Sequence, residues 1–179
     1  MTTIQEFRID FERKTNRSMS MPLAGAIVWL IIGIVSFIIP FSQAIYFMLW
    51  GSGVIFPIAL LIAKFRNEDV ILKSNPFGLL MGRCVLMVNL LWAVHIPLIL
   101  KVPEYVPLTL GIGLGLHWLV YSWIIKHPVG TIHSILRTVS ILVVWYLFPE
   151  HRIAATAFTI VAIYILSLFQ MQFREVNLG

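Results

Sequence analysis

Two arginines lie within long apolar stretches of this chain and are the residues best suited to chemistry there. Arg137 shares one helical face with His133 and Ser140, since the three recur at intervals of four and three residues. Arg83 lies six residues inside another apolar stretch. Charged side chains within such stretches mark functional sites by default, and guanidinium groups suit phosphate, carboxylate or phospholipid headgroups. The pattern therefore points to a site for an anionic group.

Two further polar side chains follow Gly113 at intervals of four residues in the neighbouring apolar stretch, which places all three on one helical face. At about 1.5 Å per residue, each arginine would lie about 9 Å deep, measured from the predicted cytoplasmic side. We therefore expect a basic pocket in the cytoplasmic leaflet, lined by Arg83, His117, Tyr121, His133 and Arg137.

Two structural roles would also explain the arginines. An arginine about 9 Å below the interface can extend its head back to it. Alternatively, the arginines bond loop carboxylates such as Glu68 or Asp69.

Composition places these residues in a membrane. The chain has 179 residues, of which 59% are hydrophobic and 12% charged, about half the ~25% charge of a soluble domain. Such a composition excludes a soluble enzyme, because a domain of this size could not bury so much apolar surface. The net charge of +5 does not indicate nucleic-acid binding, since the basic residues mostly flank apolar runs. The single cysteine, Cys84, excludes an internal disulfide, and we expect no metal or other cofactor.

Six apolar runs approach the ~20 residues that a helix needs to cross ~30 Å of hydrocarbon. They are continuous rather than alternating, which favours helices over strands. We expect an all-α bundle of about six transmembrane helices at 22–39, 44–63, 77–100, 107–125, 131–148 and 153–169. A lead-in at 1–20 would precede a single membrane domain at 21–173, and a tail at 174–179 would follow it.

Lys and Arg concentrate in alternate hydrophilic segments, chiefly 1–20 and 64–76, while the turn at 40–43 has none. Positive charge accumulates on the cytoplasmic side, so we expect both termini in the cytoplasm. Ser42-Gln43-Ala44 resembles a signal-peptide cleavage site, but the charged leader and the apolar run are both too long, so the first run is interpreted as a retained span.

The lead-in carries an apolar stripe at helical spacing, which predicts a short amphipathic helix. One interpretation is an interfacial helix that binds anionic lipid. The other is a lead-in whose bases only set the topology. Acidic residues dilute its charge and favour the second interpretation; they are Glu6, Asp10 and Glu12.

Small residues mark predicted helix contacts. Gly78 and Gly82 share a face with Asn89, and Gly111 and Gly115 recur at the same spacing in the next run. Such patterns let helices approach closely and let polar groups bond across the contact. We interpret them chiefly as packing within the chain; the alternative is contact with a partner.

Pro57 lies deep in the second run and is expected to kink it, either as a hinge that gates a cavity or as a static bend. All eight acidic residues lie outside the six runs. Proton- and cation-coupled transporters commonly use a buried carboxylate, so the sequence disfavours that class.

Two stretches together carry a resemblance. They are NPFGL at 75–79, and a segment running from VPE at 102–104 through GLHWL at 115–119 to WII at 123–125. With the charged leader, they resemble a family of small, uncharacterised bacterial multispanning membrane proteins, a domain of unknown function. The resemblance would cover nearly the whole chain. It implies a bacterial inner membrane and about this topology, and it supplies no activity.

The leading functional prediction is binding or translocation of a small anionic or lipid-like solute through the basic pocket. The alternative is a non-catalytic accessory or assembly protein whose glycine faces meet a membrane partner or a second copy. An enzyme has little support, because nothing in the sequence brings a base to a candidate nucleophile such as Ser52.

Overall fold

The computed structural model describes residues 3–176, in which helices are joined by short turns. Six helical stretches are long and apolar enough to cross a membrane, which confirms the expected all-helical, six-span fold. The elements are α1 (Ile4–Thr15), η1 (Asn16–Ser18), α2 (Ser20–Val35), α3 (Phe41–Arg66), α4 (Pro76–Leu90), α5 (Trp92–Lys101), η2 (Pro103–Tyr105), α6 (Val106–Gly113), α7 (Trp118–Ile125), α8 (Val129–Leu147), η3 (Pro149–His151) and α9 (Arg152–Phe173).

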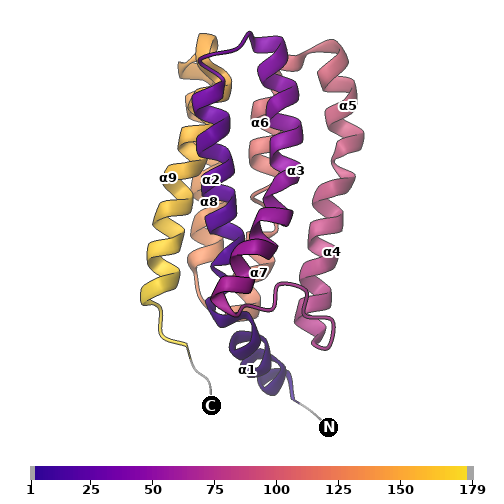
Figure 1. The fold of residues 1–179 in the computed structure, drawn as a ribbon, viewed down its shortest axis with the longest axis vertical. Coiled ribbons are helices and arrows are strands. Elements are labelled where there is room, and N and C mark those ends of the chain that lie inside the picture. The colour runs from indigo at the N-terminus through magenta and orange to yellow at the C-terminus, as the bar shows by residue number, and fades with distance from the viewer. Residues whose placement is uncertain (1–2, 177–179) are drawn as a thin grey trace.

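The spanning helices run side by side along the long axis of the molecule (Figure 1). The first, second, fifth and sixth spans are built on α2, α3, α8 and α9, whereas α4–α5 and α6–α7 each form one span from two helices. Both ends of the described chain lie beyond the same end of the bundle, as an even number of spans requires (Figure 1). We call it the α1 end; it is the end that the charge pattern predicts to be cytoplasmic.

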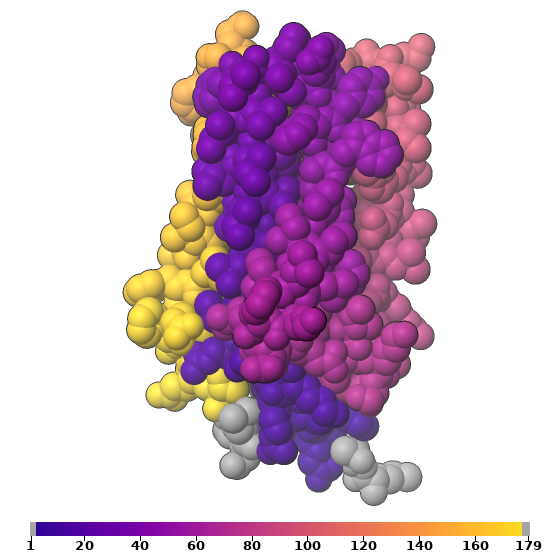
Figure 2. Space-filling view, in the orientation of Figure 1, coloured from indigo at the N-terminus to yellow at the C-terminus, as the bar shows by residue number. Residues whose placement is uncertain are grey.

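The core lies where α2, α8 and α9 pack together with α6 and α7. Its fully buried side chains include Trp29, Ile32, Ile141 and Ile160. The second and third spans are peripheral: 22% and 17% of their most apolar windows are buried, against 50% for the window in the first span. Figure 2 shows α3 over the front of the molecule and α4–α5 along its edge. Much of these two spans is therefore left to face lipid or another protein.

Helix α1 is held against the α1 end of the bundle. Thr3 and Glu6 form a capping box at its start, in which each side chain accepts a hydrogen bond from the other residue's backbone N–H. One face of α1 is buried, and its members recur at helical spacing: Arg8, Phe11, Glu12 and Thr15. Neither the lipid-anchor nor the lead-in interpretation included this packing, which makes α1 part of the folded bundle. Residues 1–2 of the predicted lead-in and 177–179 of the predicted tail lie outside the described residues.

The fourth span is interrupted, although the sequence predicted an irregularity only at Pro57, where it predicted a kink. Helix α3 continues through Pro57, which is exposed. Residues 114–117 instead separate α6 from α7. Three glycines precede or enter this segment, and glycine tolerates the irregular backbone and close approach that a break requires; they are Gly111, Gly113 and Gly115.

The turn between α7 and α8 depends on one serine and one glycine. Ser122 Oγ donates to the carbonyl of His127 and accepts hydrogen bonds from both the backbone N–H and the hydroxyl of Thr131. A β-carbon at Gly130 would overlap the carbonyl oxygen of Trp118. The close approach of α8 to α7 thus requires glycine at this position.

We predict that Gly130→Ala destabilises the protein by roughly 1–3 kcal/mol, the usual cost of overpacking a rigid contact. The measurement is the thermal unfolding midpoint in detergent. Gly53→Ala is the matched control, because a β-carbon at Gly53 meets nothing within 4 Å. Equal midpoints for the two variants would show that the α7–α8 contact is not tight.

Candidate functional site

Arg137 lies near the middle of the membrane-spanning helix that carries it. It is eight residues past Val129 in a 19-residue helix, which places it about 12 Å along α8. Its side chain is 0% exposed. Helix α8 starts two residues earlier than expected, so the arginine is deeper than the sequence predicts. Its burial excludes the interpretation that Arg137 extends to the interface.

Arg137 bonds the interrupted backbone of the fourth span. Gly115 N donates to Ile112 O at 2.8 Å, a three-residue step that leaves the Gly111 carbonyl without its usual helical donor. Arg137 Nε donates to that carbonyl at 2.7 Å, and Ser134 Oγ donates to Gly115 O at 3.0 Å. Side chains of α8 therefore stabilise the break between α6 and α7.

Glycine at position 115 is what lets the arginine reach this backbone. A β-carbon there would lie 2.6 Å from Arg137 Cδ. The guanidinium carbon also lies 5.3 Å from the ring centre of Tyr164 and 5.9 Å from that of Trp29. Aromatic faces attract cations, so these rings offset part of the cost of burying the charge.

His133 is held as a neutral acceptor beside the arginine. Ser167 Oγ donates to Ile163 O at 2.8 Å, so it accepts from His133 Nδ1, also at 2.8 Å. Nε2 of His133 then carries a lone pair and lies 3.5 Å from Arg137 Nη1. The imidazole also stacks on Trp118, with ring centres 4.0 Å apart. This packing fixes the ring that faces the guanidinium.

We call Arg137 and the residues around it, namely Gly111, Gly115, His133 and Ser134, the Arg137 centre. This centre has unused hydrogen-bonding capacity. Arg137 Nη2 is buried and has no hydrogen-bond partner among the described residues. The ion pairs found in residues 3–176 are Lys14–Asp10, Arg66–Glu68 and Arg174–Glu12, and Arg137 belongs to none of them. A buried charge without a counter-ion costs several kcal/mol. An anion entering this centre would relieve that cost.

The structure brings together three of the five residues expected to line the pocket. His133 Nε2 lies 3.5 Å from Arg137 Nη1, and His117 lies two residues after Gly115, which packs against the Arg137 side chain. Tyr121 instead donates to the carbonyl of Arg17 at the α1 end. Arg83 is exposed on α4. Glu68 bonds Ser20 and Arg66 rather than a spanning arginine.

The predicted packing residues fall into two groups. Those of the fourth span make close contacts: a β-carbon at Gly111 would lie 2.9 Å from Thr156 and 3.0 Å from Ile141. On α4, Gly78 packs against the backbone of Leu72. Further along the same helix, a β-carbon at Gly82 would meet nothing within 4 Å, and the exposed Asn89 bonds its own helix at Val85 O.

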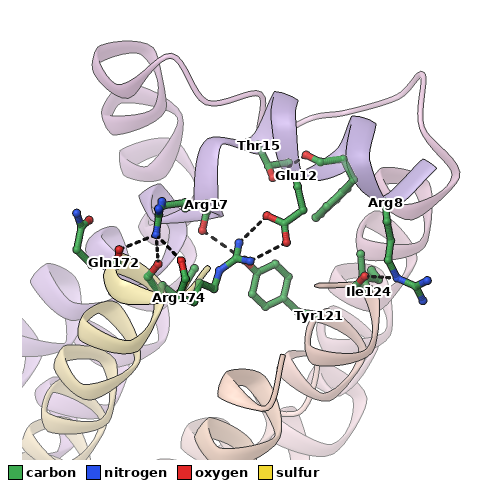
Figure 3. Close-up of polar contacts among 10 residues, drawn as sticks. Arg8, Glu12, Thr15, Arg17, Tyr121, Ile124, Gln172 and Arg174 are labelled. Carbon is green, nitrogen blue, oxygen red and sulfur yellow. Dashed lines mark hydrogen bonds and ion pairs between the residues drawn. The ribbon is translucent and has the colours of Figure 1, made fainter. Parts of the chain in front are cut away.

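A second polar cluster, which the sequence analysis did not single out, ties α1 to the bundle (Figure 3). Arg8 Nε donates to Ile124 O at 2.6 Å, at the end of α7. Arg17 Nη1 lies within 3.0 Å of the carbonyl oxygens of Met171, Gln172 and Arg174, at the end of α9. Carbonyls at helix C-termini lack helical donors and carry partial negative charge, so both arginines are well placed there.

Glu12 and Arg174 complete this cluster with an ion pair that joins α1 to the residue following α9. The two guanidinium nitrogens donate to the two carboxylate oxygens at 2.8 and 2.6 Å. Burial lowers the pKa of Arg174, but its hydrogen bonds and charge interactions with Glu12 and Tyr121 together outweigh burial, and the net pKa is raised. The available sequence signal was the spacing of Arg8 and Glu12 on the face of Phe11; their partners are more than 100 residues away.

The fold and the Arg137 centre define a multi-pass α-helical membrane protein with a buried cationic site. A model of a family of unknown function, DUF7010, matches residues 4–174, so the chain belongs to this family. The match confirms the resemblance to an uncharacterised family. No curated protein and no solved structure matches the chain.

We predict that Ser167→Ala destabilises the protein by about 1–2 kcal/mol, because His133 Nδ1 then loses a buried acceptor. Ser52→Ala is the matched control: Ser52 also bonds a carbonyl of its own helix, but it receives no hydrogen bond from a histidine among the described contacts. Unfolding midpoints measured in the same detergent compare them. A loss no larger for Ser167→Ala than for Ser52→Ala would argue against a His133 ring oriented by Ser167.

Proposed function

We propose that this protein binds a small inorganic anion at Arg137 and carries it across a bacterial inner membrane. One observation carries the proposal: within residues 3–176, a fully buried guanidinium has an unpartnered nitrogen, Nη2, and no carboxylate paired with it. The spanning helices α2 to α9 contain no Asp or Glu, so they hold no anionic side chain that would neutralise it. An anion from solution supplies the missing charge.

Close packing around Arg137 favours a small ligand over a lipid headgroup. Trp118 and His133 stack with ring centres 4.0 Å apart, and Gly115 approaches the arginine side chain directly. A halide or nitrate is far smaller than a phospholipid headgroup. Among anionic and lipid-like solutes, the small anion therefore fits best.

The interrupted fourth span supports a passage rather than a purely structural centre. Broken helices place backbone polar groups in the membrane interior and commonly form transporter binding sites. In this protein the break at 114–117 lies directly beside Arg137, whose Nε bonds Gly111 O. The same arginine thus bonds the break through Nε and carries Nη2, the nitrogen that an anion would approach.

The end of the bundle opposite α1 contains a cavity that would serve as an entrance. A cavity of about 220 Å³ lies between the α2–α3 turn and the start of α9, with His151 and Arg152 in its lining. The guanidinium carbon of Arg152 lies 4.1 Å from the ring centre of Trp145. Glu150 also lines the cavity, and its negative charge opposes the positive charge of Arg152.

We predict that Arg137→Gln reduces anion flux to the level of protein-free liposomes. The assay is chloride or nitrate efflux from proteoliposomes, with valinomycin carrying potassium to balance charge. Arg83→Gln is the matched control, because it removes an exposed arginine from another span. Flux that is equal in wild type, Arg137→Gln and empty liposomes would refute translocation.

A second candidate function, assembly with another membrane protein, rests on the peripheral position of α4. Arg83 and Asn89 are polar yet exposed on this helix, and the surface at Gly82 is open. Polar and small residues on a spanning helix are typical of helix–helix contacts. We propose that, in this case, α4 docks on a second copy of the chain.

We predict that a dimer formed through α4 dissociates in Gly82→Leu, because the added side chain blocks close approach. Gly53→Leu is the control, since Gly53 is equally open but lies on α3. Mass measured by light scattering in detergent distinguishes the states. A wild-type protein that is monomeric throughout would eliminate this candidate.

A further inference from the structure

Helix α1 and the turn η1 that follows it connect the ends of α7 and α9, the two helices that flank the Arg137 centre. Arg8 bonds Ile124 O at the end of α7, and Arg17 bonds carbonyls at the end of α9. Helix α8, which carries Arg137, packs against both α7 and α9. Tyr121 of α7 donates to Arg17 O, adding a third connection. With α1 in place, α7 and α9 cannot separate at this end.

The strongest connection is the ion pair between Glu12 and Arg174. Its side chains are 8% and 2% exposed, and both carboxylate oxygens are used (Figure 3). Removing one partner from a buried pair leaves an uncompensated charge, which is strongly destabilising. The pair therefore holds α1 closed more firmly than the backbone contacts alone.

The closed arrangement also occupies the hydrogen-bonding groups of the arginines at the α1 end. Arg8, Arg17 and Arg174 bind carbonyl or carboxylate oxygens of the protein itself. Displacing α1 would free these guanidinium groups at the mouth through which an anion reaches Arg137 from this side. One movement would both open the path and make its entrance attractive to anions.

We propose that α1 is a latch that closes the α1 end of the anion path, with the Glu12–Arg174 pair as its lock. The proposal rests on the proposed function, because it assigns the regulation of that same site. The latch consists of Arg8, Glu12 and Arg17 on the N-terminal segment, and it binds the ends of α7 and α9.

The test separates latch opening from flux. Opening is measured in a Cys84→Ala background as the labelling rate of Thr15→Cys by a water-soluble maleimide, since Thr15 is buried in the closed state. Flux is measured as chloride efflux from proteoliposomes. Glu12→Gln is compared with Glu175→Gln, which neutralises an exposed carboxylate next to Arg174. A charge-swapped variant, Glu12→Arg with Arg174→Glu, restores opposite charges.

We expect Glu12→Gln to raise both labelling and flux at least about tenfold, because a buried charge loses its partner. Glu175→Gln should match wild type, and the charge-swapped variant should return both rates toward wild type. Raised labelling with unchanged, Arg137-dependent flux would overturn the latch and leave the proposed function standing. Unchanged labelling would show that the pair is not the lock. Flux that never depends on Arg137 would overturn the proposed function, whatever the labelling.

Discussion

The burial of one guanidinium group constrains the centre of this bundle. Arg137 is 0% exposed in the middle of a spanning helix, and it belongs to none of the ion pairs among the described residues. Its Nε can be satisfied only by a carbonyl that a helix has released, and the break between α6 and α7 provides Gly111 O. The break requires glycine where the arginine passes, and Gly115 meets that requirement. Arginine, break and glycine thus depend on one another.

The imidazole and the aromatic rings extend this dependence to the remaining core helices. His133 is oriented by Ser167 of α9 and stacks on Trp118 of α7, while Trp29 of α2 faces the guanidinium. Four spans therefore contribute side chains to one polar centre. By contrast, α3 and α4–α5 contribute little to it and remain largely unburied. Their surfaces are free to meet lipid or another protein.

The sequence was sufficient for the spans, because continuous apolar runs bounded by charges leave a membrane helix as the only stable solution. It was also sufficient to single out Arg137 and His133, whose four-residue spacing is local. It was not sufficient for Tyr121 or for the contacts of Arg8, because their partners lie far along the chain and a helical face does not identify its neighbour. The interruption of the fourth span also illustrates this limit. Proline marks a position where a helix loses one donor, yet α3 continues through Pro57, whereas α8 packed against the fourth span stabilises the break there.

Arginine side chains have different surroundings in the two polar clusters, the one at the α1 end and the Arg137 centre. At the α1 end, arginines meet carbonyls of helix C-termini, which carry partial negative charge, and one of them pairs with a carboxylate. In the centre, Arg137 meets one carbonyl and one neutral imidazole, and Nη2 has no partner among the described residues. A structural role needs only the Nε bond to Gly111. The rest of the guanidinium still carries a full charge into the membrane, which an apolar residue at this position would avoid. A site for a diffusible anion requires that uncompensated charge. A purely structural role does not require it.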